Sequence, residues 1–270
     1  MKIGKYSFDF DKKSYIMGIL NVTPDSFSDG GSYTEISQAL KQAEEMVRQG
    51  ASIIDVGGES TRPGHEKISA QEEMDRVLPV MEAIRRECDV AISLDTYKYD
   101  VAKAGIAAGA DMINDIWGLQ WDDRLGPLIA ETGVACCLMH NHQGEYPGSF
   151  EEAYLRDIDE ILLRADQAGI PRDRIMLDPG VGFAKSYEEN LWVMRELGRL
   201  KAWKLPILLG VSRKSVIGLT LKLPVDQRLE GTIASTVLGR QMGASIFRVH
   251  DVEANARALK MTDAILGLSR

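Results

Sequence analysis

The chain has 270 residues, of which 44% are hydrophobic and 27% are charged, and this balance is typical of a soluble globular protein. The formal net charge of -8 argues against a general nucleic-acid or anionic-membrane binder, although it leaves room for a local basic pocket. No apolar run approaches the length of a membrane span, and the N-terminus lacks the apolar core of a signal peptide.

Strand patterns alternate with helical patterns along the chain, after a weak alternation over residues 2–9 that predicts a short hairpin. The predicted strands cover residues 16–21, 52–56, 90–94, 112–113, 134–139, 175–177, 206–210 and 245–247. The predicted helices cover residues 36–47, 74–84, a short Ala/Gly-rich stretch after residue 95, 125–131, 151–168, 188–200, 227–241 and 252–266. Eight such units favour an α/β fold with a closed parallel sheet, the (β/α)8 TIM barrel. No composition shift marks a linker, so we expect one domain over residues 1–270.

Every predicted strand ends at a polar or ionisable residue. The ends are Asn21, Asp55, Asp95, Asn114, His140, Asp178, Ser212-Arg213-Lys214 and Arg248-Val249-His250. In a barrel these positions converge on one mouth. Any one of them alone could equally be a helix N-cap or a loop residue. Eight together, with Lys, Arg and His among them, indicate one site.

The first group of strand ends predicts an anion pocket. Asn21, Arg248 and His250 come from the first and last strands, which are neighbours in a closed barrel. A salt bridge from Arg248 to Asp251 or Glu253 is the alternative.

The second group predicts a ligand that presents several N–H donors. Asp95, Asn114 and Asp178 offer two carboxylates and an amide from strands three, four and six. A metal cluster is the weaker alternative, because no His-rich or Cys-rich ligand spacing accompanies these residues.

Other stretches carry less specific signals. The piece GVSRKS lacks the glycine spacing of a phosphate loop, but Ser215 lies near a helix start, where backbone N–H groups could hold a small carboxylate. Met139 and Phe183 are typical of core or pocket wall. The loops over residues 22–32 and 58–66 are long for βα connections and predict either lids or flexible surface loops.

Nucleophilic catalysis has little support in the sequence. Cys136 and Cys137 are adjacent inside an apolar run, and no histidine accompanies a G-x-S-x-G serine. A Schiff-base lysine at Lys214 is an alternative, although Arg213 and Arg248 suit anion binding better. Three cysteines are an odd number rather than a disulfide framework, so we expect a reducing cytoplasm.

Seven ordered pieces of the chain match one known family. They are GILNVTPDSFSDGG (18–31), DVGGESTRPG (55–64), SLDTYK (93–98), IND (113–115), LDPGVGF (177–183), GVSRKS (210–215) and RVHDV (248–252). Along nearly its whole length the chain resembles dihydropteroate synthase, a folate-pathway enzyme. The resemblance implies a (β/α)8 barrel, usually a homodimer, that condenses 6-hydroxymethyl-7,8-dihydropterin diphosphate with 4-aminobenzoate, giving dihydropteroate and diphosphate, with Mg²⁺.

The resemblance also implies roles for individual residues. Asn21 resembles the residue for Mg²⁺ and diphosphate, and Arg248 and His250 resemble a diphosphate clamp. The implied pterin binders are Asp95, Asn114, Asp178 and Lys214. The implied aminobenzoate pocket consists of Phe183, Lys214 and Ser215, with Met139 as a further substrate contact.

Two loops resemble the mobile pair that closes over aminobenzoate and diphosphate. Their implied site residues are Phe27, Asp29, Thr61, Arg62 and Pro63. We place Asp29 and Arg62, with Lys214, Arg248 and His250, among the catalytic residues. Ala184 departs from the family pattern, in which a glycine is expected.

The resemblance and the residue types together suggest dissociative substitution. Diphosphate would leave first, the electron-rich dihydropterin would support the methylene cation, and Asp29 would help to stabilise it while the lids exclude water. Two alternatives stay open: a pterin-binding methyltransferase barrel that serves a corrinoid protein, and a non-catalytic pterin-binding relative.

Overall fold

Eight parallel strands form the centre of the computed structural model, which describes residues 1–23, 32–60 and 67–268. They are β3 (Tyr15–Asn21), β4 (Ala51–Gly57), β5 (Ala91–Asp95), β6 (Met112–Asp115), β7 (Ala135–Met139), β8 (Ile175–Asp178), β9 (Leu208–Leu209) and β10 (Ile246–Val249). Their order in the sheet is β8-β7-β6-β5-β4-β3-β10-β9. A parallel bridge between Leu177 and Ile207 joins β8 to the segment that leads into β9. The ring therefore closes, and the predicted barrel is confirmed.

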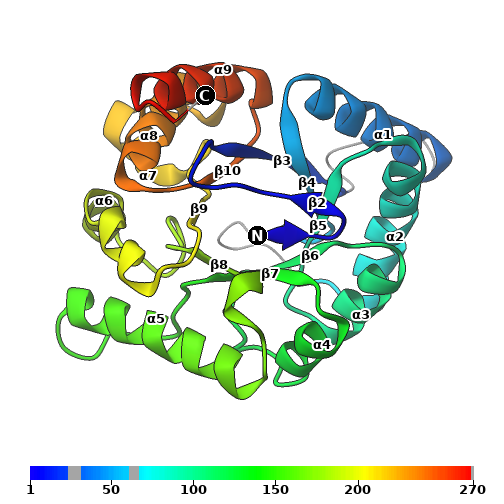
Figure 1. The fold of residues 1–270 in the computed structure, drawn as a ribbon, viewed down its shortest axis with the longest axis horizontal. Helices are drawn as coiled ribbons and strands as arrows, with labels where there is room; N and C mark the ends of the chain where they lie inside the picture. Colours follow the sequence, from blue (N-terminus) through cyan, green and yellow to red (C-terminus); the bar gives the residue numbers. More distant parts are fainter. Residues whose placement is uncertain (24–31, 61–66, 269–270) are drawn as a thin grey trace.

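The helices surround this ring of strands (Figure 1). They are α1 (Ser32–Arg48), α2 (Ala70–Glu87), α3 (Tyr99–Ala107), α4 (Leu125–Thr132), α5 (Phe150–Gln167), α6 (Tyr187–Arg195), α7 (Ser215–Leu221), α8 (Leu229–Met242) and α9 (Val252–Ile265). Serine side chains at Ser69, Ser149 and Ser186 accept backbone N–H bonds at the starts of α2, α5 and α6.

Two predicted elements differ from those observed. The predicted helix over residues 188–200 divides into α6 and a 3₁₀ segment over Leu197–Trp203. Gly198 lies just after this break, and glycine is a poor helix former. The predicted strand over 206–210 is shorter, because Pro206 has no N–H to donate to the sheet and β9 begins only at Leu208.

The predicted hairpin over residues 2–9 is present, and it covers the amino-terminal end of the barrel. Strands β1 (Lys2–Ile3) and β2 (Tyr6–Ser7) pair antiparallel around Gly4, whose φ of +57° lies in the left-handed region. The hairpin lies across the centre of the strand ring in Figure 1. Ile3 and Phe8 are buried against an apolar layer on the inner face of the barrel. The layer comprises Met17, Ile53, Ala91, Met112, Ala135, Met176, Leu208 and Ile246.

The inner face changes character two residues further along each strand. Side chains two positions apart in a strand point to the same face, so the apolar layer is followed by a second inward layer. That second layer includes Asp55, Ser93, Asn114, Cys137, Asp178 and Arg248. Strand periodicity alone therefore brings four of the eight predicted strand ends into the carboxyl-terminal mouth of the barrel. The predicted strand end His140 is an exception, because its ring faces Tyr154 and Asp157 on α5 instead.

Candidate active site

Arg248 lies at the centre of the polar layer and joins two carboxylates from neighbouring strands. Its Nε donates to Asp55 Oδ2 at 2.6 Å, and its Nη2 donates to Asp95 Oδ2 at 2.6 Å. Asn114 Nδ2 donates to the same oxygen of Asp55 at 3.3 Å. Four residues from strands β4, β5, β6 and β10 thus form one buried, charge-assisted network.

The alternative partners of Arg248 suggested by the sequence are wrong. Asp251 accepts from Arg213 instead, with 2.9 Å between Arg213 Nε and Asp251 Oδ2, and Glu253 pairs with Arg257 on α9. The reason is strand periodicity, which turns Arg248 into the barrel and away from these acids.

Burial sets the charge state of this network. It raises the pKa of Asp95 to about 7, against the lowering influence of Arg248. Burial acts to lower the pKa of Arg248, but Asp55 and Asp95 raise it overall. The guanidinium therefore keeps its charge, and Asp95 titrates near neutrality.

Asp178 and Lys214 approach the same interior from strand β8 and the segment after β9. Asp178 Oδ1 accepts from the N–H of Gly180 at 2.7 Å, and burial raises the pKa of this carboxyl while Lys214 lowers it. Lys214 Nζ donates to the Val181 carbonyl at 2.5 Å. Burial lowers the pKa of Lys214 to about 8, whereas Asp178 raises it.

An apolar wall adjoins these charges. Lys214 Nζ stands 4.7 Å from the centroid of the Phe183 ring, which is a cation–π contact. Phe183 and Met139 belong to one apolar cluster with Tyr97, Ile116 and Trp117. A flat ligand in the barrel mouth would therefore meet carboxylates at its edge and apolar side chains beside it.

Asn21 is the last residue of β3, and His250 directly follows the neighbouring strand β10. His250 Nδ1 lies 3.0 Å from Ser212 Oγ, and the backbone N–H of His250 donates to the same hydroxyl at 3.2 Å. Asn21 is half-buried at the end of β3. Ser215 is the exposed first residue of α7.

The sequence-predicted residues of the two loops lie outside the described part of the chain. These residues are Phe27, Asp29, Thr61, Arg62 and Pro63. The described flanks of the second loop are joined by Lys98, whose Nζ donates to Glu59 Oε2 at 2.6 Å and to the Ile68 carbonyl at 2.8 Å. The sequence did not single out this connection, because residues 59, 68 and 98 meet only in three dimensions.

Sequence reasoning did not assign a role to two further residues of the site, Asp55 and Lys185. Asp55 was noted only as a strand end, yet it accepts from Arg248 and Asn114. Asp55 follows the inward-facing Ile53 by two residues in the same strand, and this spacing could have predicted that Asp55 also faces the barrel interior. Lys185 contacts the turn that carries Val181 and Phe183, and no pattern in the sequence marked it.

The described residues offer no cluster of metal ligands, no reactive thiol and no membrane-spanning helix. Within residues 1–23, 32–60 and 67–268, no group of three or more His, Cys, Asp or Glu residues could hold a metal ion. Cys136 and Cys137 are buried, and burial raises the pKa of both thiols, so neither suits nucleophilic attack. No helix of the described chain combines the length and apolarity needed to cross a membrane.

Known proteins share this barrel and its sequence. Residues 17–250 match the family described as pterin binding enzyme. A dihydropteroate synthase from Clostridium beijerinckii is 52% identical over 267 residues, which cover 98% of this chain and 99% of that relative. The crystal structure of a Clostridium difficile dihydropteroate synthase in the presence of pteroic acid superposes with a TM-score of 0.93 at 49% identity, covering 96% and 99% of the two chains. A Xanthomonas albilineans dihydropteroate synthase with 4-aminobenzoic acid gives a TM-score of 0.89 at 39% identity, covering 95% and 94%.

Proposed function

Because the chain belongs to the dihydropteroate synthase family, whose members are transferases of folate biosynthesis, we propose that it makes 7,8-dihydropteroate. Its substrates would be (7,8-dihydropterin-6-yl)methyl diphosphate and 4-aminobenzoate, and its second product diphosphate. The observation that carries this proposal is the network of carboxylates, amide and cations on the inner face of one barrel mouth. Relatives crystallised with pteroic acid and with 4-aminobenzoic acid support both substrate classes.

The pterin edge would bind to the acids of the barrel interior. A pterin presents N–H donors along its pyrimidine edge, and a carboxylate such as Asp178 accepts two of them in a charge-assisted pair. Asp95 and Asn114 would complete the contacts, with Lys214 opposite. Arg248 donates one N–H from Nε to Asp55 and one from Nη2 to Asp95, so N–H groups on Nη1 and the second N–H on Nη2 would be the ones to meet substrate.

The diphosphate would leave beside Arg248, His250 and Asn21. Positive charge there would stabilise the negative charge that builds on the leaving group as its bond breaks. Magnesium fits this corner: Asn21 would supply an amide oxygen, and substrate phosphates and water would supply the remaining hard oxygen ligands. When bound, the ion would neutralise the developing charge.

These substrates favour a mechanism in which the bond to diphosphate breaks before the bond to the arylamine nitrogen forms. The arylamine is a neutral nucleophile, and the dihydropterin ring is electron-rich enough to support a methylene cation after diphosphate departs. We assign Asp29 to stabilise that cation and Arg62 to the leaving group. No covalent enzyme intermediate is needed, and a trapped protein-linked pterin would contradict this mechanism.

The aminobenzoate would bind against the apolar wall, between the charged residues of the barrel interior and the two loops. Phe183 and Met139 offer apolar surface, while Lys214 and Ser215 suit the carboxylate end. We assign Phe27, Thr61 and Pro63, together with Asp29 and Arg62, to the loops that close over the bound substrates.

We also propose that the whole chain is one barrel domain that acts as a cytoplasmic homodimer. The described cysteines are all free, which agrees with a reducing compartment. Large apolar side chains are exposed on α7, α8 and α9, which lie together in Figure 1: Leu219 (61%), Leu238 (50%), Met261 (62%) and Ile265 (72%). A second copy of the chain is the expected cover for this face.

Diphosphate release tests the proposed activity. Purified protein mixed with the pterin diphosphate, 4-aminobenzoate and Mg²⁺ should release diphosphate and form dihydropteroate, and omission of 4-aminobenzoate should abolish product formation. Pterin binding without diphosphate release would instead favour a non-catalytic protein. Methyl transfer to a corrinoid protein would favour the methyltransferase alternative.

A further inference from the structure

Lys185 makes the densest set of polar contacts near the site without belonging to the strand ends. Its ammonium lies 2.9 Å from the Gly180 carbonyl, 3.0 Å from the Phe183 carbonyl and 2.9 Å from His140 Nδ1, with the His140 carbonyl at 3.4 Å. Three N–H donors thus face four acceptors. The ammonium joins the two ends of the turn that follows β8.

This turn has a conformation that needs support. Gly180, Gly182 and Ala184 have φ values of +70°, +84° and +46°, so three of five consecutive residues are left-handed. Ala184 adopts this conformation although it carries a side chain, and Tyr146 Oη donates to the Ala184 carbonyl at 2.9 Å. Lys185 donates hydrogen bonds to two carbonyls of the turn, those of Gly180 and Phe183.

The turn matters because it holds both a wall and a charge of the site. The Val181 carbonyl accepts from Lys214 Nζ, and the Phe183 ring lies under the same ammonium. The Gly180 N–H donates to Asp178. A shift of the turn would therefore move three groups that we assign to substrate binding.

The protonation of His140 follows from its two neighbours. A lysine ammonium can only donate, so His140 Nδ1 must accept and the ring proton must lie on Nε2. Nε2 lies 3.3 Å from Asp157 Oδ2, which is an acceptor in the correct place. The His140 ring is completely buried and packs against the Tyr154 ring, with 4.3 Å between the ring centroids and 38° between the ring planes, which fixes its orientation.

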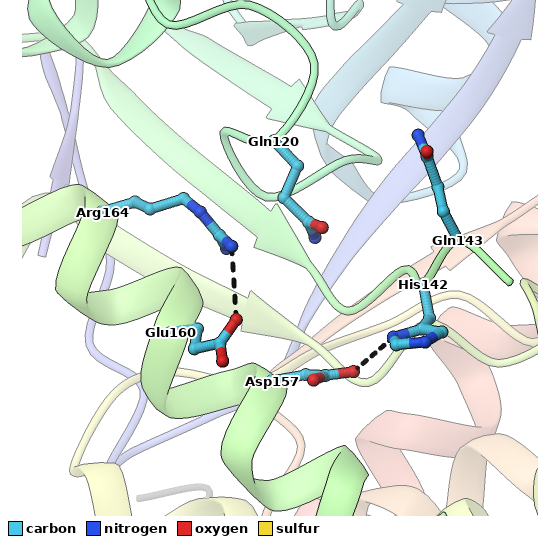
Figure 2. A pocket seen from close by; sticks show the side chains of 6 residues that line it. All are labelled: Gln120, His142, Gln143, Asp157, Glu160 and Arg164. Atoms are coloured by element: carbon cyan, nitrogen blue, oxygen red, sulfur yellow. Dashed lines mark hydrogen bonds and ion pairs between the residues drawn. The ribbon is translucent and has the colours of Figure 1, made fainter. Parts of the chain in front are cut away.

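The far end of this connection opens on a polar pocket of about 220 Å³ between α5 and the loops after β6 and β7. Figure 2 shows Asp157 and His142 pointing toward each other there, with His142 Nδ1 2.9 Å from Asp157 Oδ2. Glu160 and Arg164, one turn further along α5, pair with each other instead. Only Asp157 of these two α5 acids connects to the buried lysine.

We propose that Lys185 is a positioning residue for substrate binding: linked through neutral His140 to the carboxylate of Asp157, it fixes the turn over residues 179–184 and thereby Phe183 and Lys214. The charges that face Lys185 come from several elements: Asp178 on β8, Asp157 on α5, Glu189 on α6, and Lys214 before α7. The three acids favour its ammonium form and Lys214 opposes it.

The charge states of His140 and Asp157 agree with this arrangement. Burial lowers the pKa of His140 to about 4, with Lys185 acting in the same direction, so the imidazole is neutral at pH 7. Burial acts to raise the pKa of Asp157, but hydrogen bonds to His140 and His142 lower it overall. Burial lowers the pKa of Lys185 to about 7.

Steady-state kinetics of Lys185→Met test the positioning role, and this readout rests on the proposed condensation. Methionine keeps the length of the side chain but gives the two carbonyls no donor. We expect the KM for 4-aminobenzoate to rise by about 10- to 100-fold while kcat falls by less than about threefold, because a misplaced wall weakens binding. Asp157→Asn should change KM in the same direction by less, since a neutral oxygen still accepts.

The matched control is Glu160→Gln, which removes a carboxylate from the same helix and pocket without touching the connection. Its KM should equal that of the natural protein. A KM for 4-aminobenzoate that stays within about twofold in Lys185→Met would overturn the positioning role. A KM in Asp157→Asn equal to that of Glu160→Gln would overturn the link through His140.

Nitrogen NMR of labelled histidine tests the link without substrate or activity. At pH 6, where the Lys185 ammonium predominates and His140 is neutral, His140 should carry its proton on Nε2, with Nδ1 as a hydrogen-bonded acceptor whose resonance moves in Lys185→Met. A proton on Nδ1 of the natural protein would overturn the link, even where the lysine variant fails to fold. Absence of diphosphate release together with the expected tautomer would overturn the proposed function and support the link.

Discussion

The two ends of the barrel interior are built from the same strands yet serve opposite physical purposes. At the amino-terminal end, inward residues such as Met17, Ile53 and Met176 pack under Ile3 and Phe8 of the hairpin. This layer is apolar and sealed from water, so it contributes to the free energy of folding. The contrast begins only two residues further along the strands.

At the carboxyl-terminal end, the next inward layer holds charges that folding has to desolvate. Asp55 Oδ1 and Ser93 Oγ are buried and find no hydrogen-bond partner among the described residues. Asp95 has its pKa raised by burial. Such a layer lowers stability unless its groups are paired, so we expect it to serve recognition rather than folding.

Replacing Arg248 by methionine should have the largest effect on the polar end. The change leaves Asp55 and Asp95 without their shared cation, so we expect a loss of about 3 kcal/mol in the free energy of unfolding and a loss of measurable product formation. Urea unfolding and a diphosphate-release assay measure the two effects. Arg257→Met removes an exposed pair on α9 and should change neither. Unchanged stability in Arg248→Met would contradict the network described above.

Replacing Ile3 by alanine tests the apolar end. This fully buried side chain closes the bottom of the barrel, so its truncation should lower the free energy of unfolding by about 3 kcal/mol. Activity at 25 °C should not change, because the site is at the other end. Lys2→Ala, at the exposed neighbouring position, is the control. A large loss of activity in folded Ile3→Ala would show that the two ends are not independent.

Replacing Asp178 by asparagine should separate recognition from stability at the polar end. The variant loses the charged acceptor for a pterin edge, so we expect pterin binding to weaken by about 2 kcal/mol. The free energy of unfolding should stay equal or rise, since a buried carboxylate is removed. Calorimetric titration with a pterin ligand and urea unfolding provide the two numbers. Unchanged pterin affinity would count against the assigned role of Asp178.

The pH dependence of stability should also distinguish the two ends. Asp95 has its pKa raised from 3.8 to about 7, so the folded protein binds an extra proton between these values. Its contribution to stability is therefore full below pH 3.8 and is lost as the pH rises through 7.

Unfolding of Asp95→Asn at several pH values checks this sign. Relative to the natural protein, the variant should gain stability as the pH rises from 4 to 7. Ile3→Ala has no titrating group at the changed position, so its difference from the natural protein should be constant across the same range. A constant difference for Asp95→Asn as well would refute the raised pKa.

The sequence by itself determined the barrel and the list of residues at its mouth. Alternating strand and helix patterns require a parallel sheet, and polar residues such as Asp95, Asn114 and Asp178 stand where buried strands end. These signals are local, because they depend on periodicity and on residue type within a few positions. The hairpin over residues 2–9 was predictable for the same reason.

Only the tertiary structure decided which of these groups pair. Arg248 chooses Asp55 and Asp95, which lie 193 and 153 residues away, over Asp251, which is three residues away. Lys185 finds His140 across 45 residues. Strand pleating and helix placement decide these contacts, since a side chain bonds to what shares its face of the barrel and not to what is near in the chain.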